Sequence, residues 1–123
     1  MELEYSDEKV KLQCTSVKAA RKLFGGDEAL TVKLMSRISA LTAAETIKDI
    51  ISQSSFRFHS LHNKGRKKYQ DLFSIDVKSP KEAWRIILRP LDQDKKPYEP
   101  CNIDEIANKV TIVEIMEVSK HYE

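Results

Sequence analysis

The stretch that decides the fold class is FSIDVKSPKEAWRIILR, residues 73–89. In its first part large apolar residues alternate with Ser74 and Asp76, and in its second part they alternate with Arg85 and Arg89. A period of two residues is typical of a strand that has one face against an apolar core. The stretch therefore predicts two neighbouring strands, each with a bulky apolar face.

A further strand is expected before this stretch. At Phe56 the helical period gives way to alternation, which places Phe56 and Phe58 on one face of the strand. Arg57 and His59 then share the other face. At the far end of the stretch, Pro90 has no backbone N–H to donate and is expected to end the third strand.

A long loop and a last strand are expected after Pro90. Pro97 and Pro100 mark the segment up to residue 108 as a loop, with one helical turn over 104–107. The last strand is predicted over 110–118. Apolar residues occupy both of its faces, so the pattern leaves its register open.

The first third of the chain predicts a short edge strand followed by a helical hairpin. Residues 1–5 alternate between apolar and acidic side chains. Ser6 is expected to cap a first helix that ends at Gly25-Gly26, and Asp27 to cap a second. Residues 42–45, Thr-Ala-Ala-Glu, fit a capping box at which the second helix bends and restarts. The apolar stripes are Val10, Cys14, Val17, Ala20 and Phe24 on the first helix and Leu30, Leu34, Ile38 and Leu41 on the second.

Helices first and strands afterwards predict a single α+β domain over residues 1–123. The helical hairpin is expected to pack on the Phe, Ile and Trp face of an antiparallel-rich sheet. The opposite face then carries a set of basic side chains, and function is expected there. These side chains are Arg57, His59, Arg85 and Arg89.

The net charge of +2 hides an uneven distribution. Residues 56–100 hold eleven Lys and Arg against six Asp and Glu, and the basic density is highest between Arg57 and Lys68. Such a cluster can bind nucleic-acid phosphates, or it can simply keep a turn solvated. Its candidate RNA-binding residues are Arg57, His62, Lys64, Arg66, Lys67 and Lys68.

Other classes of protein fit the sequence less well. No apolar run approaches the roughly 18 residues of a membrane span, and the acidic start at residues 1–4 is unlike a secretory signal. The two cysteines form no C-x-x-C pair, so a reducing cytoplasm is expected. His59 and His62, three residues apart on a strand, would point to opposite faces. We therefore expect no metal site, no cofactor, and no serine or cysteine nucleophile.

A set of short motifs runs in order along most of the chain. They are Tyr5-Ser6-Asp7, Lys22-Leu23-Phe24-Gly25, Arg37-Ile38-x-x-Leu41-x-x-Ala44, Arg57-Phe58-His59-Ser60-Leu61, Gly65-Arg66-Lys67, Phe73-Ser74-Ile75-Asp76-Val77, Trp84-Arg85-Ile86-Ile87, Glu114-Ile115 and His121. Their order and spacing resemble the HigB-type killer toxins of the RelE superfamily, which are bacterial toxins of toxin–antitoxin pairs. The resemblance implies a RelE-like twisted sheet and a single toxin domain.

The activity that this resemblance implies is cleavage of messenger RNA on the ribosome, with the 2′-hydroxyl of the RNA as nucleophile and without a metal. Such chemistry needs a base, cations for the phosphorane and an acid for the leaving oxygen. The resemblance assigns His59, Arg85 and His121 to the active positions of the family. Lys64 is its proposed counterpart of a further basic residue of the family, and His62 competes for that position.

The C-terminus departs from the family pattern. Where the family commonly ends in Asp-Tyr-His, this chain has Ser119-Lys120-His121, so that Lys120 would replace hydrogen bonding by charge. These departures leave a second hypothesis open. The same basic face could bind RNA or the ribosome, or serve in a regulatory complex, without cutting.

The resemblance also implies protein partners. It predicts a helix-turn-helix antitoxin of the HigA type, in a complex that could be a heterotetramer, besides the ribosome and its messenger RNA. An acidic antitoxin segment could cover the basic face, or the antitoxin could bind the helices at a distance. The sequence does not choose between these two, although inhibition of HigB-type toxins favours the helices.

Overall fold

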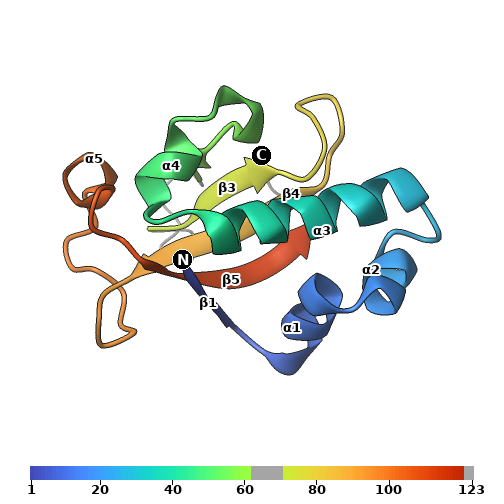
Figure 1. The fold of residues 1–123 in the computed structure, drawn as a ribbon, viewed down its shortest axis with the longest axis horizontal. Helices are drawn as coiled ribbons and strands as arrows, with labels where there is room; N and C mark the ends of the chain where they lie inside the picture. The colour runs from blue at the N-terminus through green and yellow to red at the C-terminus, as the bar shows by residue number, and fades with distance from the viewer. Residues whose placement is uncertain (62–70, 121–123) are drawn as a thin grey trace.

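The computed structural model describes residues 1–61 and 71–120. In this part of the chain five strands form one sheet in the order β1-β5-β4-β3-β2, with antiparallel neighbours except for the parallel pair β1 and β5 (Figure 1). The mostly antiparallel sheet and its helices agree with the predicted α+β class. The elements are β1 (Glu2–Tyr5), α1 (Glu8–Thr15), α2 (Val17–Leu23), α3 (Glu28–Ala43), α4 (Ile47–Ile51), the 3-10 turn η1 (Ser54–Phe56), β2 (His59–Ser60), β3 (Phe73–Asp76), β4 (Arg85–Leu91), α5 (Ile103–Ile106) and β5 (Ile112–Ser119).

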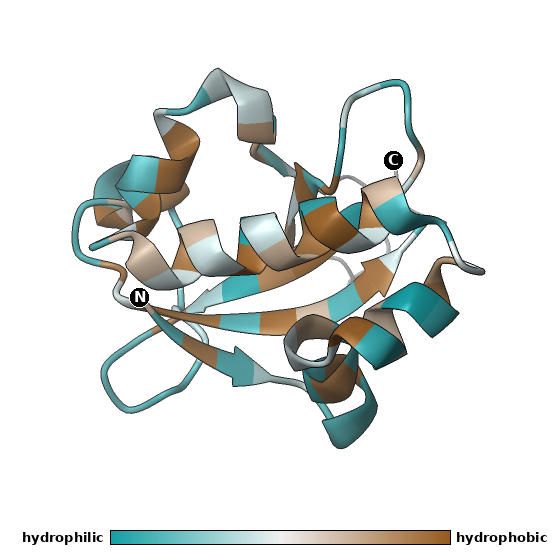
Figure 2. Ribbon diagram, turned by 45° about the vertical axis from the view of Figure 1, so that its right-hand side comes forward, coloured by the Kyte–Doolittle hydropathy of each residue, from teal (hydrophilic) through white to brown (hydrophobic). Residues whose placement is uncertain are grey.

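The main core lies between the helices and one face of the sheet. Figure 1 shows α3 crossing this face, and Figure 2 shows apolar segments on the strands beneath it. Leu34 and Leu41 of α3 are fully buried against the apolar side chains of the central strands, such as Ile75 and Ile86. Burial of this apolar area is the main favourable term in folding. The helices therefore cover the sheet face that the alternation predicted.

The first helix of the prediction is in fact two helices, α1 and α2. Ser16 interrupts it, because its hydroxyl accepts a hydrogen bond from the Ala19 N–H at 3.2 Å and starts α2. The cap of α1 is Asp7, which accepts from the Val10 N–H at 2.8 Å. Ser6 was the wrong cap, since its hydroxyl donates instead to the Met116 carbonyl at 2.7 Å.

The hairpin turn was predicted correctly, but the restart of the second helix was not. Gly25 and Gly26 both adopt positive φ, and Asp27 caps α3. The capping box that begins α4 is Thr46 with Asp49, rather than residues 42–45. The hydroxyl of Thr42 donates to the Ile38 carbonyl within α3, so it cannot cap the next helix.

The strand predicted from Phe56 begins later, at His59. Phe56 belongs to η1 and Arg57 has a left-handed backbone with φ 49°, so within the described residues it is His59 and Ser60 that pair with β3. Phe58 still packs against the core, where its ring stacks on Phe73 at 5.0 Å between centroids. The alternation was therefore right about burial and wrong about the backbone.

Pro90 does not end its strand, because β4 continues to Leu91. The pairing of β3 with β4 stops at Leu88, and the bridge from Leu91 to Pro97 begins beyond Pro90, so among the described residues Pro90 itself pairs only with Val113 of β5. A proline is tolerated at such an edge, where one side of the ladder needs no donor.

The register of the last strand depends on a bulge. Ile87 pairs with Glu117, and Leu88 pairs with Ile115, which leaves Met116 as the extra residue. The extra residue shifts by one which residues of β5 face the core. Core-facing apolar residues therefore have odd numbers before the bulge and even numbers after it. The predicted helical turn is present as α5. Among the described residues, no helix combines the length and the apolar character that a membrane crossing requires.

Candidate functional site

The candidate site lies on the sheet face that points away from α3, called the second face here. Its residues follow from the register: His59 pairs with Ser74, Ser74 with Ile87, and Asp76 with Arg85. Directly paired residues of antiparallel strands share a face. Ser74 and Ile87 are buried although they point away from the main core, so the middle of the second face is not open to solvent.

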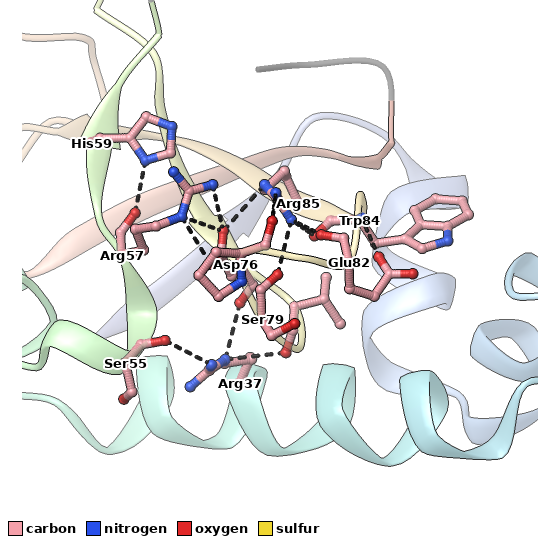
Figure 3. Close-up of polar contacts among 11 residues, drawn as sticks. Arg37, Ser55, Arg57, His59, Asp76, Ser79, Glu82, Trp84 and Arg85 are labelled. Atoms are coloured by element: carbon pink, nitrogen blue, oxygen red, sulfur yellow. Dashed lines mark hydrogen bonds and ion pairs between the residues drawn. The ribbon is translucent and has the colours of Figure 1, made fainter.

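Asp76 is the centre of the polar cluster on this face. Its carboxylate is fully buried, and Arg57 donates from Nε to both of its oxygens at 3.1 and 3.0 Å. Arg85 Nε lies 3.1 Å from Oδ1 (Figure 3). A buried carboxylate is tolerated only when it is paired, so Asp76 and the two arginines form one unit. The sequence analysis did not select Asp76, although a carboxylate in an otherwise buried strand was a signal.

Arg85 is almost completely buried and holds the loop before its own strand. Its Nη1 donates to the carbonyls of Trp84, at 2.8 Å, and Glu82, and its Nη2 donates to the Pro80 carbonyl at 3.2 Å. The residue is 7% exposed. A phosphate would have to displace some of these carbonyls to reach the guanidinium. The active position that the resemblance assigns to Arg85 stays a prediction.

Arg37 of α3 supports the same cluster from the other side. It donates from Nε to the carbonyl of Asp76 at 3.0 Å and from Nη2 to that of Ser55 at 3.0 Å. Its guanidinium also lies over the Phe56 ring, 4.4 Å from the centroid. Burial lowers the pKa of Arg37, and the Asp76 charge opposes this shift. Arg37 thereby connects α3 with η1 and β3, a role that its helix position did not reveal.

His59 is held in one orientation beside Arg57. Its Nδ1 lies 2.7 Å from the Arg57 carbonyl oxygen. A carbonyl oxygen can only accept a hydrogen bond, so we assign the proton of the neutral ring to Nδ1. Nε2 then carries the lone pair. Figure 3 shows the ring next to the Arg57 guanidinium, with Nε2 on the side away from the carbonyl.

Arg89 and Lys120 lie outside the polar cluster around Asp76, at two different places. Arg89 donates from Nε to Glu114 Oε1 at 2.7 Å and faces the same side of β4 as Arg85. Lys120 follows β5, and its Nζ lies 5.7 Å from the centroid of the Trp84 ring. Lys120 is therefore near the loop that Arg85 holds, whereas Arg89 lies about 13 Å along the strand from Arg85, at 3.3 Å per residue.

The remaining candidates lie outside the described residues. They are His62, Lys64, Arg66, Lys67, Lys68 and His121. Their contributions stay predictions from the sequence. In residues 1–61 and 71–120, His, Cys, Asp and Glu side chains form no group of three or more that could hold a metal ion.

Comparisons with known proteins add no assignment, because no protein family, curated protein or solved structure matches this chain.

The arrangement has a definite chemical capacity. An imidazole with its proton at Nδ1 can accept another proton at Nε2, and Arg57 provides a partly exposed cation beside it, with 41% of its side chain accessible. A base next to a guanidinium suits the activation of a hydroxyl near a phosphate. The described part of the second face can therefore supply two of the three functions that RNA cleavage needs.

Proposed function

We propose that this chain is the toxin of a type II toxin–antitoxin system and has a RelE-like fold. In this proposal it is a ribosome-dependent RNA endonuclease that cuts messenger RNA in the cytoplasm. The observation that carries the proposal is the 2.7 Å contact between His59 Nδ1 and the Arg57 carbonyl. It aligns a base beside a cation, at the start of the most basic stretch of the sequence.

His59 is the general base of the proposed reaction. Its Nε2 takes the proton of a ribose 2′-hydroxyl, the 2′-oxygen attacks the adjacent phosphorus, and the bond to the 5′-oxygen breaks. The products are a 2′,3′-cyclic phosphate and a new 5′-hydroxyl end. Arg57 stabilises the charge that develops on the phosphorane. The acid that protonates the 5′-oxygen is proposed to be His121 or Lys64.

A second candidate is a non-catalytic subunit that binds RNA or the ribosome. The contacts of Arg85 favour this second candidate, because its guanidinium already binds Asp76 and the carbonyls of Pro80 and Trp84. An arginine in such contacts stabilises a loop whether or not any phosphate is cut. Both candidates predict RNA affinity, and only the first predicts new RNA ends.

The test is a translation reaction with purified ribosomes, a defined messenger RNA and the purified chain. We expect new 5′ ends inside the coding region of ribosome-bound RNA and little cutting of naked RNA, since a small site needs the ribosome to hold the strand in line. His59→Ala should abolish the cuts, and Lys33→Ala, which removes an exposed cation of α3, should not. Intact RNA with retained ribosome binding would favour the second candidate.

The proposed partner is a helix-turn-helix antitoxin that binds the helical side of the molecule. The supporting feature is an open groove of about 590 Å³ between α1 and α2, which Leu12, Ala19 and Leu23 line together with charged residues of both signs. Leu12 is 50% exposed and lies in this groove beside Ala19 and Leu23, so together they offer apolar surface that a partner can cover. We propose that an amphipathic antitoxin helix with mixed charge occupies this groove.

Amide protection of the purified toxin–antitoxin complex tests this docking. Protection of α1 and α2 is expected. Protection confined to residues 57–68 and 85–89 would instead mean that the antitoxin covers the second face.

A further inference from the structure

A pocket opens beside Arg89, at some distance from the polar cluster around Asp76. It has a volume of about 500 Å³, within the range of roughly 300–1,000 Å³ that is usual for ligand sites. The loop between β4 and α5 folds back to form one wall, since Leu91 pairs with Pro97 and Asp92 N–H donates to the Lys96 carbonyl at 2.8 Å. The lining residues are Asp71, Arg89, Pro90, Pro97, Tyr98, Glu99, Pro100 and Cys101.

The pocket continues the second face beyond His59. Arg89 lies two residues along β4 from Ile87, and Ile87 belongs to the same cross-strand row as His59. With about 3.3 Å per residue and 4.8 Å between strands, the Cα atoms of Arg89 and His59 are about 12 Å apart. Figure 1 shows the loop at the end of the sheet away from α2. A nucleotide next to the scissile bond can span this distance from phosphate to base edge.

The walls of the pocket combine flat apolar groups with both kinds of hydrogen-bonding partner. Proline rings and the half-buried Tyr98 ring provide surfaces on which a planar ring can lie. The carboxylates of Asp71 and Glu99 are acceptors. The Asp71 charge is close enough to Cys101 to raise the pKa of its thiol, with burial as the larger cause, which places that carboxylate near the pocket wall.

Arg89 provides the donors. Glu114 holds its Nε at 2.7 Å, which orients the guanidinium, and the Nη groups have no acceptor among the described residues. A guanidinium fork fits the O6 and N7 acceptors of guanine, and a carboxylate accepts from exocyclic amino groups of bases. Guanine also carries N–H donors on its Watson–Crick edge, so it can use both kinds of partner in this pocket. Adenine lacks the O6 acceptor.

We propose that this pocket binds a guanine base of the single-stranded RNA beside the cleavage site and so sets a sequence preference. The inference rests on the proposed function for its biological setting. Binding of the base by the isolated chain can nevertheless be measured without any cleavage.

The experiment measures fluorescence polarisation with labelled oligouridylate that carries one central guanosine, adenosine, cytidine or no replacement. We expect the guanosine RNA to bind roughly 5- to 140-fold more tightly than all-uridine RNA, since a bidentate base contact is worth about 1–3 kcal/mol. Replacing the guanosine by 7-deazaguanosine, which removes the N7 acceptor, should reduce the preference.

Three variants locate the preference. Arg89→Lys keeps the charge and loses the fork, and Glu99→Gln changes an exposed acceptor without disturbing the core, so both should weaken the guanosine preference. Lys96→Ala removes an exposed cation of the same loop that does not line the pocket, and it should lower the affinity for all RNAs alike.

The outcomes separate this inference from the proposed function. Equal affinity for all four RNAs, preference for another base, or a guanosine preference that Arg89→Lys and Glu99→Gln both leave unchanged would overturn the pocket assignment. Cleavage on the ribosome would then remain testable by itself. A guanosine preference without any RNA cleavage would support the pocket and count against the nuclease.

Discussion

Arg57 and Asp76, which are 19 residues apart in the chain, meet through contacts at 3.0 Å between the guanidinium and both carboxylate oxygens. The pair joins the left-handed turn after η1 to the end of β3. It also fixes the backbone carbonyl that orients His59. The position of the proposed base therefore depends on a carboxylate that takes no part in the proposed chemistry.

Asp76→Asn should destabilise the fold by about 3–5 kcal/mol, because two arginines lose the charge that compensates them in a buried site. Urea unfolding measures the change. The matched control is Ser74→Ala on the same strand and face. The buried Ser74 hydroxyl has no hydrogen-bond partner among the described residues, so its removal should change stability by no more than about 1 kcal/mol. Equal losses for both variants would contradict the central role of Asp76.

Arg85→Lys separates a structural role from a phosphate contact. A lysine cannot bind Asp76 and the Pro80 and Trp84 carbonyls at once, so we expect a loss of about 1–3 kcal/mol in unfolding free energy. Thermal and urea unfolding provide the measurement. Unchanged stability together with lost cleavage would show that Arg85 acts on the phosphate instead.

His59→Ala should lower the rate of cleavage on the ribosome by roughly 10²–10⁴-fold, the usual contribution of a general base, while ribosome binding stays intact. Single-turnover cleavage and co-sedimentation with ribosomes give the two quantities. Stability should change little, since the ring is half-buried and its hydrogen bond within the described residues goes to the Arg57 carbonyl. Full cleavage by the variant would remove His59 from the mechanism.

The basic segment should act on binding rather than on chemistry. Replacing Lys67 and Lys68 together by Ala is expected to weaken ribosome binding and to reduce its salt dependence. Cleavage of RNA that is already bound should continue at nearly the normal rate. A normal affinity with slow cleavage would mean that these lysines belong to the catalytic group.

The two thiols should be protected from alkylation in the folded chain. Burial raises the pKa of Cys14 to about 12 and that of Cys101 to about 11, from an ordinary value of 9.0. Iodoacetamide at pH 8 should therefore label the unfolded chain much faster than the native one, as site-resolved mass spectrometry can show. Because the thiol pKa values are higher in the folded chain than in the unfolded chain, the two buried neutral thiols contribute fully to the free energy of unfolding below pH 9. This contribution falls as the pH rises towards 11 for Cys101 and towards 12 for Cys14. Rapid labelling of native Cys14 would contradict its burial.

Local patterns were sufficient for the class of the fold. Helical stripes and strand alternation depend only on which face of each element is buried, so they predicted α3 and the apolar faces of β3 and β4. Caps were predictable where one side chain had no competing partner, as at Asp27. They were not predictable at Ser6 and Thr42, whose hydroxyls bond to carbonyls that the folded chain brings close.

The residue types of the candidate site were predictable from the sequence, but the hydrogen bonds and ion pairs among them were not. Alternation placed Arg57, His59 and Arg85 on one face, and the structure brings all three to the surroundings of Asp76. Sequence alone could not show that Arg85 is committed to loop carbonyls or that Arg37 reaches the cluster from α3. Both facts depend on contacts between segments that are distant in the chain.

The sequence by itself determined the order of helices and strands, the apolar faces of the central strands and the concentration of positive charge in the middle of the chain. Each of these follows from neighbours along the chain. Only the tertiary structure decided the left-handed turn at Arg57, the continuation of β4 through Pro90 and the bulge at Met116. The reason is physical: each of these backbone choices is stabilised or permitted by a strand or side chain far away in sequence, so no local pattern contains it.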